Sequence, residues 1–128
     1  MSLWRIRVVV ARPDERAEVV EIDNDLATLQ ELVGGHIEAV PLEAIDAWLA
    51  LKLQRSETPL LHLYANEDGY REELAINLHL PGHPMPIVGP IVASKASPTT
   101  GEEIGLSPEL AELVRRWLDE IRGMGGGA

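Results

Sequence analysis

The sequence predicts an α+β fold in which one domain combines a mixed or antiparallel sheet of about five strands with two or three helices. Short apolar segments bounded by Gly, Pro and Asp recur along the chain, as expected of strands joined by turns. Two periodic segments carry helix caps, and the second has an apolar stripe that is expected to pack on the sheet. A length of 128 residues with 45% hydrophobic content is typical of a single domain. We assign residues 1–122 to this domain and residues 123–128 to a flexible glycine-rich tail.

The N-terminal segment is predicted to form a β-hairpin. Trp4–Ala11 alternates between polar and apolar residues and then becomes continuously apolar, which favours a strand that is buried on at least one face. Residues 12–16 read Arg-Pro-Asp-Glu-Arg, which is typical of a turn, and Glu18–Ile22 alternates again.

A short capped helix is predicted at Asp25–Val33. Asp25 and the two residues before it favour a helix start, and Gly34-Gly35 favours a left-handed helix stop before an extended segment, His36–Pro41. A glycine pair that binds phosphate precedes a helix, whereas this pair follows one, so the helix-stop interpretation is preferred. The expected buried face comprises Leu26, Leu29, Leu32 and Val33.

Two further helices are predicted. Apolar residues recur with a helical period over residues 43–57, and this segment is best interpreted as a helical insertion with Trp48 on its apolar face. The C-terminal helix begins at Ser107-Pro108, where serine is a favourable cap and proline a favourable first residue. We expect this helix to pack across the sheet through Leu110, Leu113, Val114, Trp117, Leu118 and Ile121.

A second hairpin is predicted around the turn Asp68-Gly69. A tight turn there places Leu63 opposite Leu74 and Leu61 opposite Ile76 on an apolar face. Polar side chains then collect on the other face and form the candidate binding surface, which comprises His62, Tyr64, Asn66, Glu73 and Asn77. A histidine beside a glutamate is a possible general base, but half-solvated hairpins carry such residues routinely, so we assign no catalytic residue.

Composition excludes several classes of function. The net charge is −10, from 21 acidic and 11 basic residues, which argues against direct binding to nucleic acid or to an anionic membrane. The chain has no Cys and therefore no disulfide or thiolate site. No apolar segment is long enough to span a bilayer, and the N-terminal segment reads as a strand rather than a signal peptide, so a cytoplasmic location is expected.

His79 and His83 have the spacing of a metal-binding pair. Residues 81–86 contain three prolines and predict a loop, whereas two histidines four residues apart converge on a metal when they lie on a helix. We therefore interpret them as loop histidines and expect neither a metal nor a cofactor. Ile87–Ala93 is predicted to be extended, followed by a polar loop over residues 97–105.

The combination and order of four motifs resemble a family of small proteins, classed as a domain of unknown function, from bacteria, phages and plasmids. The matching segments are LQELVGGHIEAVPL at residues 29–42, YANEDG at 64–69, Asn77, and IVGP at 87–90. Two features depart from the family pattern. Residues 43–57 look like an insertion, and residues 74–78 read LAINL where members often have Leu-Pro-x-Asn-Arg. The resemblance implies the fold and a link to mobile elements, and it implies no particular activity.

Three functions are consistent with the sequence. The first is a non-catalytic interaction module with an unidentified protein partner, and a homodimer is a possible assembly. The second is an acidic decoy for a DNA-binding protein, which requires carboxylates on one face and Arg5, Arg7, Arg115 and Arg116 elsewhere. The third is a histidine-based or metal-assisted hydrolase, which requires at least three of His62, Glu73, His79 and His83 to converge.

Overall fold

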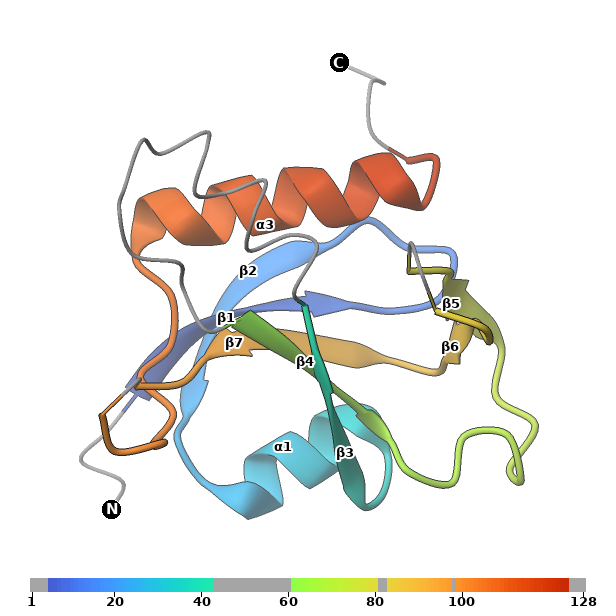
Figure 1. The fold of residues 1–128 in the computed structure, drawn as a ribbon, viewed down its shortest axis with the longest axis horizontal. Helices are drawn as coiled ribbons and strands as arrows, with labels where there is room; N and C mark the ends of the chain where they lie inside the picture. The colour runs from blue at the N-terminus through green and yellow to red at the C-terminus, as the bar shows by residue number, and fades with distance from the viewer. Residues whose placement is uncertain (1–4, 43–60, 81–82, 98, 125–128) are drawn as a thin grey trace.

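A five-stranded antiparallel sheet forms the centre of the computed structural model, which describes residues 5–42, 61–80, 83–97 and 99–124 (Figure 1). The strand order is β2-β1-β7-β4-β3. A separate two-stranded sheet pairs β5 (Ile76–Leu78) with β6 (Ile87–Val88). The α+β prediction is therefore confirmed. The strands of the main sheet are β1 (Arg5–Ala11), β2 (Glu18–Asp23), β3 (Ile37–Pro41), β4 (Leu61–Asn66) and β7 (Ile91–Lys95).

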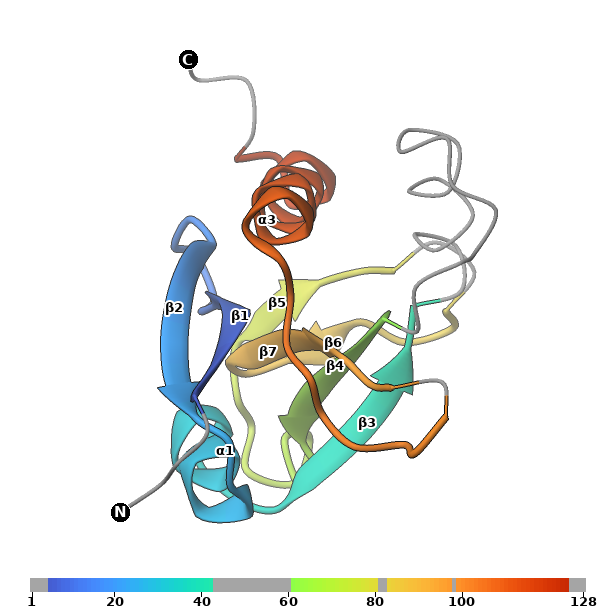
Figure 2. The same cartoon turned by 90° about the vertical axis from the view of Figure 1, so that its left-hand side faces the viewer.

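The two described helices cover opposite faces of the sheet, α1 (Leu26–Val33) on one side and α3 (Pro108–Ile121) on the other (Figure 2). Successive side chains of a strand point to opposite faces, so β1 contributes Val8 to the core under α1 and Val9 to the core under α3. Both side chains are fully buried. The continuous apolar run in β1 is thus explained by burial on both faces.

The N-terminal hairpin and the helix that follows it are confirmed. β1 and β2 pair antiparallel, with Val8 opposite Val20. The Asp25 side chain accepts a 2.7 Å hydrogen bond from the amide of Thr28, and Gly34 ends α1 in the left-handed conformation at φ 82°. A residue with a β-carbon is strained at that φ, so the glycine is required for this helix stop. Leu26 departs from the prediction, because it is 56% exposed.

The predicted second hairpin is wrong. Leu63 lies opposite Val40 of β3 and Ala93 of β7, whereas Ile76 lies opposite Val88 in the small sheet. Residues 67–74 form successive turns, and Glu73 adopts a left-handed φ of 57°, which a continuing strand does not allow. β7 instead occupies the centre of the sheet. Its apolar residues are buried on both faces and suit that position better than the polar segment after the turn.

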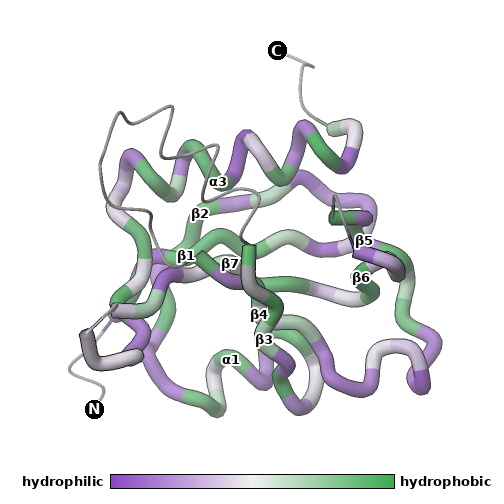
Figure 3. The backbone as a smooth tube through the Cα atoms, in the orientation of Figure 1, coloured by the Kyte–Doolittle hydropathy of each residue, from purple (hydrophilic) through white to green (hydrophobic). Residues whose placement is uncertain are grey.

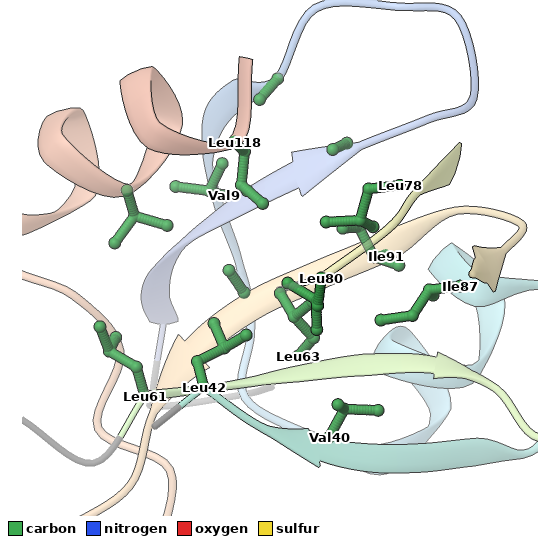
Figure 4. Close-up of a cluster of buried hydrophobic side chains, with 14 of the residues drawn as sticks. Val9, Val40, Leu42, Leu61, Leu63, Leu78, Leu80, Ile87, Ile91 and Leu118 are labelled. Atoms are coloured by element: carbon green, nitrogen blue, oxygen red, sulfur yellow. The ribbon is translucent and has the colours of Figure 1, made fainter. Parts of the chain in front are cut away.

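The C-terminal helix packs on the sheet as predicted. The Ser107 hydroxyl accepts a hydrogen bond from the amide of Leu110, and Pro108 occupies the first turn. Figure 3 shows hydrophobic and hydrophilic residues alternating along α3, and Figure 4 shows Leu118 directed at the sheet beside Val9. Leu118 is fully buried, whereas Trp117 is only partly buried. Among the described helices, none is long and apolar enough to cross a membrane. The predicted helix at 43–57 lies outside the described residues.

Candidate functional site

The five residues of the predicted binding surface do not share one face. His62, Tyr64 and Asn66 alternate along β4 and therefore point to the side of the sheet that α1 covers. Glu73 lies exposed in the turns after β4, and Asn77 is buried in β5. The structure thus brings together the three residues of β4 and separates the other two from them, because the hairpin that was predicted to join them does not form.

Asn66 connects two of the motif segments. Its side-chain amide donates to the carbonyl of Val33 at the end of α1 (3.3 Å) and to the carboxylate of Glu72 (3.1 Å). Its side-chain oxygen accepts from the amide of Asp68 at 2.8 Å. A β-carbon at Gly35 would lie 3.0 Å from the Asn66 amide nitrogen, so the helix stop and this asparagine are packed closely. Asn66 is 6% exposed and acts as a structural link.

Asn77 makes a comparable link for the other two motif segments. Its amide donates to the carbonyl of Ala11 at the end of β1 (2.9 Å) and to the carbonyl of Gly89 (2.8 Å). Gly89 belongs to the IVGP segment, which joins β6 to β7. Because Asn77 is 8% exposed and both amide hydrogens have acceptors, it holds the small sheet against the main one.

A half-buried cluster around one carboxylate, which we name the Glu103 cluster, comprises Glu103, His62, Tyr64 and Ser94. The Tyr64 hydroxyl donates to Oε1 of Glu103 at 2.5 Å, and Nε2 of His62 lies 2.6 Å from the same oxygen. His62 lies directly opposite Ser94 in the β4–β7 pair, and its ring packs edge-on against that of Tyr64. The carboxylate thus ties the loop before α3 to β4.

The environment of Glu103 stabilises its ionised form. Burial alone would raise the pKa of this carboxyl, but hydrogen bonds from His62, Tyr64 and Ser94 outweigh it and lower the pKa below its ordinary value. The pKa of Tyr64 is raised, first by burial and then by its hydrogen bond to the Glu103 carboxylate. The ionised form of Glu103 and the protonated form of Tyr64 therefore stabilise each other.

The Glu103 cluster contains the residue types of a serine–histidine–acid triad but not its arrangement. In a triad the hydroxyl contacts the imidazole and is open to substrate. Here Ser94 is fully buried, no hydrogen bond joins its hydroxyl to the His62 ring among the described residues, and the His62 side chain is only 13% exposed. The geometry supports a structural clamp rather than a nucleophile with its base.

His79 and His83 make a contact between a ring and the backbone. Nε2 of His79 lies 3.0 Å from the carbonyl oxygen of His83, and the amide of His83 donates to the carbonyl of Leu80. Within the described residues, no group of three or more His, Asp or Glu side chains is placed to hold a metal ion. The convergence that a histidine-based or metal-assisted hydrolase requires is therefore not observed in that part of the chain.

A cleft of about 140 Å³ opens at the end of the sheet where β3 and β4 meet the small sheet. The turns after β4 and the loop before β6 border it, and the course of these two segments can be followed in Figure 1. Val40, Ala65 and Ile87 are apolar lining residues. Five exposed residues also line this cleft, namely Glu38, Glu67, Tyr70, His83 and Met85.

Sequence reasoning missed both the Glu103 cluster and the cleft. Ser94 carried one usable signal, since it is a polar residue inside the apolar run of β7. Glu103 and Tyr70 lie in loops without periodicity, so no pattern in the sequence indicated their partners.

Ion pairs mix both signs of charge on the surfaces where the decoy hypothesis needs them separated. Arg5 pairs with Asp23 at 3.6 Å, and Arg7 with Glu21 at 3.4 Å, across the N-terminal hairpin. Arg115 on α3 lies 2.5 Å from Glu112. This interleaving disfavours a continuous surface of phosphate-like charge.

The chain was also compared with known proteins. Searches of curated proteins and of solved structures gave no significant match. A family model described as "Domain of unknown function (DUF3846)" matches residues 6–119, which span α1, α3 except its last two residues, and all the described strands except the first residue of β1. The chain therefore belongs to this DUF3846 family.

Proposed function

We propose that this domain is a non-catalytic protein-interaction module and that the cleft between β3, β4 and the small sheet is its binding site. The motif resemblance to proteins of bacteria, phages and plasmids favours a setting in phage or mobile-element biology. The observation that carries the proposal is the cleft itself, because it combines an apolar floor with exposed side chains. Tyr70 is 54% exposed and Met85 is 56% exposed, and such residues are enriched at protein interfaces.

The use of the motif residues supports a non-catalytic role. Asn66 and Asn77 have their side-chain amides directed at backbone carbonyls, and Gly34 ends a helix. His62 and Glu103 are engaged with each other. Residues with these roles stabilise a particular fold, and they leave the accessible chemistry to the rim of the cleft.

The size of the cleft favours a side chain of a partner over a cofactor. Sites for drug-sized ligands have volumes of about 300–1,000 Å³, and this cleft is smaller. A partner that inserts one or two side chains buries the exposed Tyr70 and Met85, which are the expected energetic centre of the interface.

The test is selection of peptides from a displayed library of random short sequences on the immobilised domain. Selected peptides are then measured by fluorescence anisotropy against Met85→Ser and against a matched control, Leu26→Ser. Leu26 is also 56% exposed but lies on α1, on the opposite side of the sheet. We expect Met85→Ser to weaken binding about tenfold and Leu26→Ser to leave it unchanged.

Two results would overturn the proposal. One is that every selected peptide binds Met85→Ser as tightly as the parent, since the site would then lie elsewhere. The other is reproducible turnover in a broad hydrolase and transferase screen that a cleft variant abolishes, since the domain would then be an enzyme.

A further inference from the structure

Resting on the proposed function, we propose that the cleft binds a segment of a protein partner that presents a lysine or arginine next to an apolar side chain. The cation lies between Glu38 and Glu67, and the apolar side chain packs against Tyr70 and Met85. This inference specifies the chemistry of the partner, which the cleft alone does not.

The two glutamates at the cleft have no partner within the described part of the chain. Glu38 projects from β3 on the same side as Val40, and Glu67 follows the last residue of β4. Both are exposed, and neither carboxylate makes a hydrogen bond or an ion pair to any residue that the structure describes. Two carboxylates on one small cleft produce a local negative potential that attracts a cation.

Two acidic side chains close to the cleft have partners within the described chain, unlike Glu38 and Glu67. Asp68, one residue beyond Glu67, lies 3.0 Å from Arg71, and Glu72 accepts from the Asn66 amide. Among the described lining residues of the cleft there is no lysine or arginine. The cleft therefore carries two unpaired carboxylates without a lysine or arginine among its described lining residues, and a cation from outside the domain complements them.

Tyr70 gives the cleft a fixed aromatic wall. Its hydroxyl donates to the carbonyl of Pro86 across the opening, which holds the ring in place although 54% of the residue is exposed. The turns that carry it are positioned by Gly69, whose missing β-carbon allows contact with Val88. A fixed aromatic ring beside two carboxylates suits a cation with an aliphatic stem, because the ring contacts the stem or the charge while the carboxylates bind its head.

A lysine or arginine side chain supplies both the cationic head and the aliphatic stem. When it belongs to a protein segment, a neighbouring residue of that segment can supply the apolar contact. Met85, on the opposite border of the cleft, supplies a flexible apolar surface that adapts to different neighbouring side chains. The net charge of −10 adds a long-range attraction for a basic partner.

The experiment uses the same displayed library on the full chain, followed by synthetic versions of the selected peptides. Each peptide is measured against the double variant Glu38→Gln/Glu67→Gln and against the control Glu31→Gln/Glu120→Gln. The control removes two exposed glutamates from the helices and changes net charge equally. We expect selected peptides to pair Lys or Arg with an apolar residue, and we expect the cleft variant to weaken binding about tenfold more than the control. Rising salt should weaken binding to the parent more than binding to the cleft variant.

The inference is wrong if peptides that need Met85 carry no excess of lysine or arginine. It is also wrong if they bind the cleft variant and the control equally. Either result leaves the binding module intact, since dependence on Met85 tests the site and dependence on the glutamates tests the partner. Circular dichroism and thermal unfolding of each variant verify that the fold is unchanged, as expected for exposed substitutions.

Discussion

Substituting Glu103 by glutamine should destabilise the domain, although the side chain keeps its size. The Glu103 carboxylate accepts from Tyr64 at 2.5 Å and lies 2.6 Å from His62. Hydrogen bonds to a charged group contribute about 1.5–3 kcal/mol, against about 0.5–1.5 kcal/mol for neutral pairs. Removing the charge weakens both contacts, so we expect Glu103→Gln to lower the free energy of unfolding by about 1–3 kcal/mol near neutral pH.

The effect should depend on pH. The pKa of Glu103 in the folded state is below the ordinary value of 4.5, because hydrogen bonds from His62, Tyr64 and Ser94 outweigh the effect of burial. A lowered folded-state pKa makes this stabilisation fully present above the ordinary value, and it is lost as pH falls through the folded-state pKa. The difference between parent and Glu103→Gln should therefore shrink as the pH falls below 4.5.

Urea unfolding followed by tryptophan fluorescence measures this difference at several pH values. Glu102→Gln is the control, because Glu102 is the exposed neighbour and should change stability by less than about 0.5 kcal/mol. Equal unfolding midpoints for the parent and Glu103→Gln near neutral pH would refute the role of the cluster. A difference that stays constant into acid would show that its origin is not the charge.

Two further outcomes follow from the structure. Leu118→Ala should lower the free energy of unfolding by about 2–5 kcal/mol, because Leu118 is fully buried. Trp117→Ala should lower it by less than the usual ~3–5 kcal/mol, because Trp117 is only partly buried. Thermal unfolding of both variants measures these changes. If Trp117→Ala instead melts like the parent while a dimer becomes a monomer in size-exclusion chromatography, the helix is an oligomer interface. A Tyr70→Phe variant has Tyr64 as its sole tyrosine. Burial and then the Glu103 carboxylate raise the pKa of Tyr64. The contribution of Tyr64 to stability is therefore present below about pH 10 and is lost as the pH rises from there through the folded-state pKa. Phenolate absorbance that rises near pH 10, before any loss of circular dichroism, would contradict this burial.

Elements with local signals could be predicted from the sequence. The cap at Asp25, the stop at Gly34 and the start at Ser107 each depend on residues within one helical turn, and each is present in the structure. The antiparallel N-terminal hairpin follows from alternation on either side of a short turn. These features need no knowledge of distant residues, which is why sequence reasoning was adequate for them.

Strand pairing beyond the first hairpin could not be predicted in the same way. The turn at Asp68-Gly69 favoured pairing of Leu63 with Leu74, yet β4 pairs with β3 and β7. The burial of an apolar strand on both faces stabilises the fold more than a local turn preference does. β7 is such a strand, and it pairs with β4 although it lies about thirty residues further along the chain.

The sequence by itself determined the helix ends, the fold class and the acidic character of this domain. Tertiary structure alone decided that Glu103 meets His62, and that Glu38 and Glu67 border one cleft. Glu103 and Glu67 lie in loops, which have no periodicity, and the neighbours of all three carboxylates depend on where the sheet brings distant segments of backbone together. For that reason the side chains of the proposed binding site could be grouped only once the strand order β2-β1-β7-β4-β3 was known.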